Sequence, residues 1–159
     1  LDLSMNTQLI RPFSQVDGRY LQDSELSSIQ DFVTSYEQRT NVYRYLKDHS
    51  DTLILKTFRS LMASHRKVIQ THSEICKRDM SLVLRYIAVS ILKDDENSFI
   101  EGLVLWMQNI LFALNKEEQS VEFYIALQRI VAQEMTTGEA ALVNQYLSTF
   151  IDALRVGKS

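Results

Sequence analysis

The scarcity of residues that interrupt helices is the feature that most constrains the fold of this chain. Only four glycines and one proline occur in 159 residues, so few positions favour tight turns. Apolar residues recur every three or four positions rather than in strict alternation, which is the pattern of helices packed around a core. The sequence therefore predicts an all-α fold.

Apolar stripes and helix-start signals divide the chain into six expected helices. Their approximate ranges are 24–46, 51–62, 71–92, 98–114, 119–131 and 137–154. The expected N-caps are Asp23 or Ser24 for the first, Asp51 for the second and Thr136 for the last. Thr136 is followed by Glu139 at capping-box spacing.

Acidic residues 94–96 favour a helix start, because negative charge is stabilised at the positive end of the helix dipole. No linker, repeat or low-complexity tract divides the chain, so residues 1–159 are expected to form a single domain. Residues 1–4 precede Met5, look like a remnant of expression and are left out of the argument. A short helix containing Pro12 is expected before Gly18, outside the main bundle.

Charge and hydropathy exclude several classes of function. Seventeen Lys and Arg stand against 20 Asp and Glu, so the chain lacks the basic surface of a nucleic-acid binder. The longest apolar stretch, 102–114, is interrupted by Gln108 and Asn109 and is shorter than the roughly 20 residues of a membrane span. The lone Cys76 has no partner for an internal disulfide, and no zinc-site spacing is present, which suits a reducing compartment.

Two blocks of sequence carry a family resemblance. The first is Arg-Tyr-Leu at 19–21, followed by Glu-Leu at 25–26, Ile29 and Phe-Val-Thr at 32–34. The second is Cys-Lys-Arg-Asp-Met at 76–80, followed by Leu-Arg-Tyr at 84–86. In this order, and with helices of matching length, the chain resembles the phycobiliproteins, especially allophycocyanin, over residues 16–154.

The resemblance implies a globin-like helical bundle with a short N-terminal helical arm that builds the subunit dimer. It also implies an open-chain tetrapyrrole, a bilin similar to phycocyanobilin, attached to Cys76 by a thioether. Arg78 would hold a propionate and Asp79 would accept hydrogen bonds from pyrrole N–H groups, and Arg85 and Tyr86 continue the same motif.

The family also implies a setting for the protein. We expect a non-enzymatic role in light harvesting, energy transfer or pigment handling. The expected partner is a second copy or a related phycobiliprotein subunit. The expected location is cytoplasmic, with a possible peripheral association with the thylakoid membrane.

The chain departs from the family pattern in three places. The loop that normally precedes the motif, between Met62 and Cys76, is shortened, so ordinary disc assembly is not expected. Leu82 and Val83 stand where the family usually has aromatic residues, which predicts a more apolar and less tightly moulded pocket. The family's aspartate before Arg-Tyr-Leu is replaced by Gln15, leaving Asp17 as a candidate partner for Arg85.

Other functions stay open at this point. His72 lies four residues before Cys76, so on a continuous helix it could reach an iron porphyrin instead of a bilin, giving a haem-binding or haem-trafficking protein. A pigment-free scaffold or regulator of the phycobilisome could act through the arm and the tyrosine-rich stretch 36–45. The aromatic residues that could line a flat ligand or simply fill the core are Trp106, Phe112, Phe123 and Tyr124.

Overall fold

The computed structural model describes residues 18–156, and every regular element within them is helical. In chain order these are α2 (Asp23–Lys93), α3 (Glu96–Phe99), the π-helix η1 (Ile100–Val104), α4 (Leu105–Ala113), α5 (Glu117–Glu134) and α6 (Thr137–Val156). The predicted all-α fold is confirmed. The expected helix around Pro12, and the expected pairing through Asp17, lie outside the described residues.

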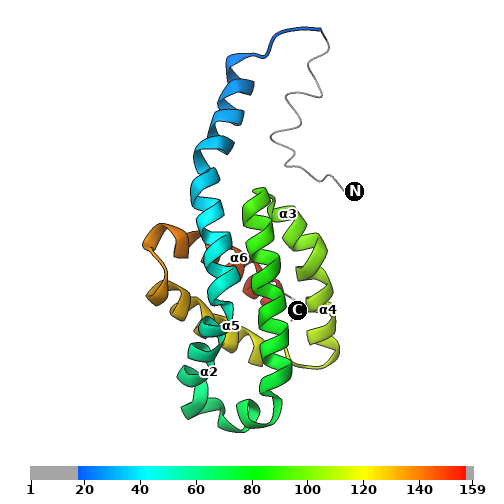
Figure 1. Ribbon diagram of the computed structural model, residues 1–159. Coiled ribbons are helices and arrows are strands. Elements are labelled where there is room, and N and C mark those ends of the chain that lie inside the picture. The colour runs from blue at the N-terminus through cyan, green and yellow to red at the C-terminus, as the bar shows by residue number, and fades with distance from the viewer. Residues whose placement is uncertain (1–17, 157–159) are drawn as a thin grey trace.

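Element α2 doubles back on itself. The backbone leaves helical geometry at His65 (φ −128°, ψ 29°) and at His72 (φ −127°, ψ 17°). Figure 1 shows that the chain reverses between these two histidines, so that the two parts of α2 run side by side. We call residues 23–64 the first limb, residues 65–72 the bend and residues 73–93 the second limb.

The structure corrects two expected helix boundaries. No new helix starts at Asp51, because α2 is helical on both sides of it and Leu46, Leu53 and Ile54 continue one buried stripe. The burial of this stripe outweighs the weak preference of Asp51 for an N-cap. The third expected helix starts after the distortion at His72 rather than at Thr71.

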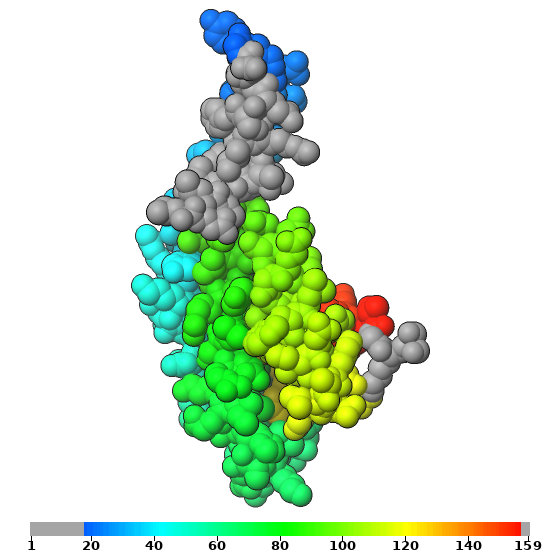
Figure 2. Space-filling model, turned by 90° about the vertical axis from the view of Figure 1, so that its right-hand side faces the viewer, coloured from blue at the N-terminus to red at the C-terminus, as the bar shows by residue number. Residues whose placement is uncertain are grey.

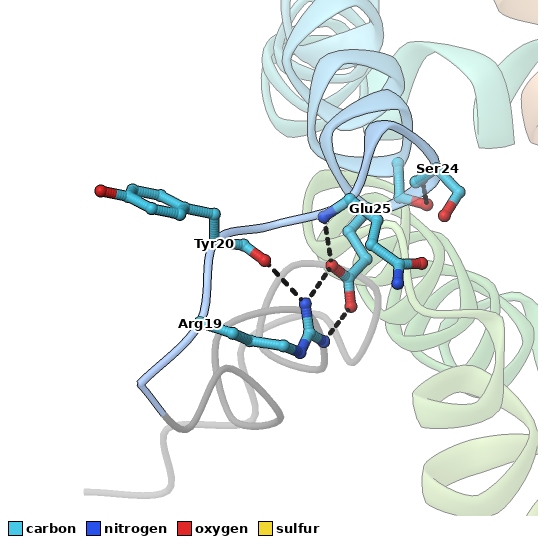
Figure 3. A network of polar contacts seen from close by, with 6 residues as sticks. Arg19, Tyr20, Ser24 and Glu25 are labelled. Atoms are coloured by element: carbon cyan, nitrogen blue, oxygen red, sulfur yellow. Dashed lines mark hydrogen bonds and ion pairs between the residues drawn. The ribbon is translucent and has the colours of Figure 1, made fainter.

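The start of α2 is held by an ion pair that the sequence did not predict. The N-cap is Gln22, not Asp23 or Ser24. The carboxylate of Glu25 accepts a hydrogen bond from the backbone N–H of Gln22 at 2.7 Å. It also accepts one from each terminal nitrogen of Arg19, at 2.8 and 3.0 Å (Figure 3). These bonds to Arg19, and then the bond to Gln22, lower the pKa of Glu25 to about 2.

A buried arginine fastens the first limb to the second. Arg39 is only 3% exposed and donates to the carbonyl oxygens of Phe32, at 2.9 Å, and of Leu92. Its guanidinium also lies 4.3 Å from the centre of the Phe32 ring. The charge is thus compensated by carbonyl dipoles and an aromatic face, including a carbonyl near the negative end of the second limb.

The segment after α2 begins and ends at turns that each contain a residue with left-handed backbone conformation. Asp94 (φ 54°) closes α2, and the carboxylate of Asp95 then accepts the backbone N–H of Ser98 at 3.2 Å to cap α3. The prediction that acidic residues start this helix is therefore confirmed. Asn115 (φ 52°) turns the chain from α4 to α5, and α6 begins at Thr137, directly after the expected cap Thr136.

The core lies where α5 and α6 pack against α2 and the α3–η1–α4 segment. Tyr124 meets Phe150 edge to face with ring centres 4.7 Å apart, and Phe99 meets Tyr146 at 5.5 Å. In Figure 2 the second limb and α4 lie next to each other on one face, and the start of the first limb projects beyond the bundle. Within residues 18–156, no helix has the length and apolar character that crossing a membrane requires.

Candidate functional site

A cavity of about 280 Å³ opens between the second limb, α4 and α5. Each element contributes residues three or four positions apart, so that one face of each helix points to the same space. The second limb supplies Cys76, Asp79 and Met80, α4 supplies Met107 and Leu111, and the turn into α5 and its first turns supply Leu114, Lys116, Gln119, Ser120, Phe123 and Tyr124. The volume is close to the lower end of the roughly 300–1,000 Å³ usual for ligand pockets, so it encloses only part of a large ligand.

Three of the predicted site residues come together in this cavity. Cys76 and Asp79 line it from successive turns of the second limb, and His72 lines it from the bend. His72 does so although its backbone is distorted, so the continuous helix expected from His72 to Cys76 is not present. Val68 also reaches the cavity, so the shortened connection before the motif still supplies two of the lining residues.

Arg78 lies beside the cavity rather than in it. Its side chain is 75% exposed and its Nη2 atom lies 3.2 Å from Oδ1 of Asp79. An ion pair this exposed contributes little stability, because water screens it. Its effect here is to occupy one oxygen of the Asp79 carboxylate.

Arg85 and Tyr86 are placed on other surfaces. Arg85 lies nine residues after Cys76, which turns it by about 180° around the helix. It lines a groove against the first limb together with Tyr43 and Lys47, and Tyr86 lines a neighbouring hollow with Arg85 and Lys93. The structure therefore does not bring either residue to the cavity of Cys76.

The thiol of Cys76 is half-buried and protonated at neutral pH. Burial is the main cause that raises its pKa above 9, the carboxylate of Asp79 raises it further, and the ammonium of Lys116 opposes the rise. Nucleophilic and metal-binding cysteines need a lowered pKa, since the thiolate is the reactive form. Within the described residues, no group of three or more His, Cys, Asp and Glu side chains is arranged to hold a metal ion.

Tyr124 lines the cavity from α5, and its hydroxyl group is buried. The side chain is 4% exposed, and its oxygen has no hydrogen-bond partner among the described residues. Burial raises its pKa well above 10, with smaller contributions from Asp79 and Cys76. Buried polar atoms nearly always have partners in native proteins, so this unpaired hydroxyl beside the cavity is a candidate contact for a ligand group.

Sequence reasoning missed the polar residues on the α5 side of the cavity. Lys116, Ser120 and Tyr124 follow one another at intervals of four and therefore share a face of the helix. That spacing was the available signal, but it could not show which face turns towards Cys76. The sequence offers Tyr124 as an aromatic ring that could line a flat ligand or fill the core, and its hydroxyl group carried no prediction.

The other aromatic residues divide between the cavity and the rest of the molecule. Phe123 lines the cavity and packs edge to face against His65 at 5.4 Å. Nε2 of His65 lies 2.5 Å from Oε2 of Glu122, and this contact fastens the bend to α5. Trp106 is 53% exposed, and neither it nor Phe112 lines the cavity.

The fold defines an all-helical protein with one side of its bundle hollowed by a cavity between the second limb, α4 and α5. The chain belongs to the family of phycobilisome proteins, which matches residues 14–154. The resemblance to phycobiliproteins and the globin-like helical fold expected from it are thereby confirmed.

Curated relatives are similar to the chain at low identity. The C-phycocyanin beta chain of Porphyra purpurea is 21% identical over 140 residues, which cover 83% of this chain and 77% of the relative. The allophycocyanin subunit alpha 1 of Nostoc sp. is 23% identical over 151 residues, which cover 89% and 94%. The R-phycocyanin-1 beta chain of Porphyridium purpureum is 21% identical over 140 residues, again covering 83% and 77%.

Proposed function

We propose that this chain is a non-enzymatic pigment protein of the phycobilisome that holds an open-chain tetrapyrrole at Cys76. The observation that carries the proposal is the meeting of Cys76 and Asp79 in one mainly apolar cavity. The thiol can anchor the pigment covalently, and the carboxylate can accept hydrogen bonds from pyrrole N–H groups.

The residues present fit such a group. Phe123, Met107 and Leu111 offer apolar surface to a conjugated ring system, and the unpaired hydroxyl of Tyr124 can donate to a ring carbonyl. When bound, the pigment supplies absorption of visible light, and the packed helices restrict its motion. Because the cavity encloses part of a tetrapyrrole, the rest would lie outside it, along the surface of the protein.

The covalent step needs no oxidant or reductant. Sγ of Cys76 forms a C–S bond by adding to an exocyclic C=C bond of the pigment, and the proton of the thiol ends on the adjacent carbon. The raised pKa of Cys76 means that the thiolate is scarce at neutral pH. Attachment is therefore expected to be slow in the isolated protein and faster at higher pH.

Co-expression with a source of phycocyanobilin tests the proposal. We expect a coloured adduct that survives denaturation in the wild-type chain and is absent from Cys76→Ala. A denaturation-resistant adduct in Cys76→Ala would overturn attachment at this thiol. A Soret band after incubation with haemin that is lost in His72→Ala would instead establish the haem-binding alternative.

We further propose that the start of the first limb pairs with a second subunit of this family. Leu26, Val33 and Tyr36 lie on one stripe of the first limb and are 48, 63 and 54% exposed. The limb projects beyond the bundle at this point, so the stripe has no cover from the rest of residues 18–156 (Figure 1). An apolar stripe on a projecting helix is suited to packing against another helix.

Light scattering with size-exclusion chromatography tests the pairing, alone and with an allophycocyanin subunit. We expect a dimer mass for the wild type and a monomer mass for Val33→Glu. Leu55→Glu, an equally exposed residue elsewhere on the first limb, is the matched control and should leave the mass unchanged. A Val33→Glu chain that keeps the dimer mass would overturn this interface.

A further inference from the structure

We propose that Lys116, rather than Arg78, holds a carboxylate of the bound tetrapyrrole, and that Tyr124 hydrogen-bonds the same ligand deeper in the cavity. This inference rests on the proposed pigment binding and specifies which residues select the ligand. It concerns the part of the cavity that faces α5. The Cys-Lys-Arg-Asp-Met motif on the second limb supplies no cation to this part.

The distribution of charge around the cavity carries the first step. Among the residues that line it in the described part of the chain, Lys116 is the only lysine or arginine. Arg78 points to solvent with 75% of its side chain exposed, and it already contacts Asp79. A propionate that enters the cavity therefore meets the ammonium of Lys116, not the guanidinium of Arg78.

The backbone fixes Lys116 at the rim. Its N–H donates to the carbonyl of Leu111 at 2.9 Å, and its own carbonyl accepts the N–H of Ser120 at 2.9 Å. Both of these neighbours also line the cavity. Lys116 is thus held between two walls of the site, and the side chain needs only to rotate to reach a ligand.

Lys116 also stands at the N-terminal end of α5, where it is the N-cap. The amide groups of the first helical turn lie here and favour negative charge, part of which Glu117 and Glu118 of the same turn supply. Gln119 and Ser120, from the same turn, add an amide and a hydroxyl to the wall. These neutral donors can complete the hydrogen bonds of a carboxylate.

Tyr124 provides the independent observation that a polar ligand group belongs in this space. Its hydroxyl is buried without a partner on the same face of α5, two turns beyond Lys116. Two turns of helix span about 11 Å, so Lys116 and Tyr124 can contact separate groups of one elongated molecule. With Asp79 opposite, the cavity offers a cation, a hydroxyl donor and an anionic acceptor.

An open-chain tetrapyrrole meets all three of these groups. Its propionates suit Lys116, its pyrrole N–H groups suit Asp79, and its terminal carbonyl suits the hydroxyl of Tyr124. A porphyrin lacks the terminal carbonyl. The arrangement therefore favours the open-chain pigment.

A comparison of the binding of esterified and free pigment tests this inference separately from the proposed function. The experiment measures the Kd of Cys76→Ala, which binds without covalent attachment, for biliverdin and for biliverdin dimethyl ester. We expect the free acid to bind about ten- to a hundredfold more tightly, the effect of one charge-assisted hydrogen bond. Adding Lys116→Met should remove most of this preference, and Lys116→Arg should retain it.

Two substitutions serve as controls. Lys77→Met removes an equally charged lysine on the far side of the second limb, where it lines a different hollow, and should leave the preference intact. Arg78→Gln should also leave it intact. Lys116→Met that keeps the preference, or Arg78→Gln that removes it, would overturn the inference.

Two further outcomes distinguish a failure of this inference from a failure of the proposed function. Equal affinities for acid and ester in the Cys76→Ala parent would refute the role of Lys116 while the pigment site stands. No binding of either form would refute the proposed function itself, and the inference with it. Lys116 is exposed, so its substitution should not disturb folding.

Discussion

Tyr124→Phe is expected to make the ligand-free protein more stable. The hydroxyl of Tyr124 is buried without a partner, and such a group costs about 1–3 kcal/mol of folding free energy. The substitution removes one oxygen and keeps the aromatic ring, which packs against Phe150 at 4.7 Å. We therefore expect the free energy of unfolding to rise by about 1 kcal/mol, the lower end of that range, because the group borders a cavity.

Urea unfolding of the ligand-free chains measures this change, and a thermal melt should show a rise of roughly 2–4 °C. Tyr45→Phe is the matched control, since its hydroxyl donates to the carbonyl of Glu134 at 3.4 Å. Loss of that bond should leave stability unchanged or lower it. A Tyr124→Phe chain that is less stable by 1 kcal/mol or more would show that the hydroxyl has a partner and would refute the reasoning.

The same substitution should weaken pigment binding. A neutral hydrogen bond contributes about 0.5–1.5 kcal/mol, so the Kd of Tyr124→Phe for biliverdin should rise roughly two- to twelvefold. The hydroxyl would then destabilise the free protein and stabilise the complex. Opposite signs in the two assays distinguish a ligand contact from an ordinary core residue, which would lower both stability and affinity together.

Three further predictions follow from single contacts. Arg39→Met should lower the free energy of unfolding by about 2 kcal/mol, measured by urea titration, because it removes the hydrogen bonds of a buried charged donor to the carbonyls of Phe32 and Leu92; a change within 0.5 kcal/mol would contradict this role of Arg39. The pKa of Glu25 falls from 4.5 to about 2 in the folded chain, so the stabilisation of the α2 start is complete above pH 4.5 and is lost as the pH falls towards 2. The circular dichroism signals of wild type and Glu25→Gln should therefore converge as the pH falls over this range, and high salt should make the difference between them smaller. Alkylation of Cys76 by iodoacetamide at pH 8 should be slower than that of free cysteine, and Asp79→Asn should accelerate it, because both burial and Asp79 raise the thiol pKa; an unchanged rate in Asp79→Asn would contradict the electrostatic part.

The helices were largely predictable, and each exception has a specific physical cause. Asp51 resembles an N-cap in sequence, yet it lies within a helix because the buried stripe continues past it. Arg39 is a charged residue in the first limb, yet it is buried because the carbonyl of Leu92, 53 residues away, and the carbonyl and ring of Phe32 compensate its charge. Such compensation depends on partners distant in sequence, which periodicity cannot reveal.

The sequence by itself determined the all-helical class, because few residues could interrupt helices, and its resemblance to the phycobiliproteins pointed to Cys76 and Asp79. Only the tertiary structure decided which residues share their cavity. It excluded Arg78, Arg85 and Tyr86 from the lining, retained His72 despite a distorted backbone, and added Lys116 and the buried hydroxyl of Tyr124. The reason is geometric: helical spacing fixes which residues share a face, whereas the packing of the second limb against α4 and α5 fixes which faces meet.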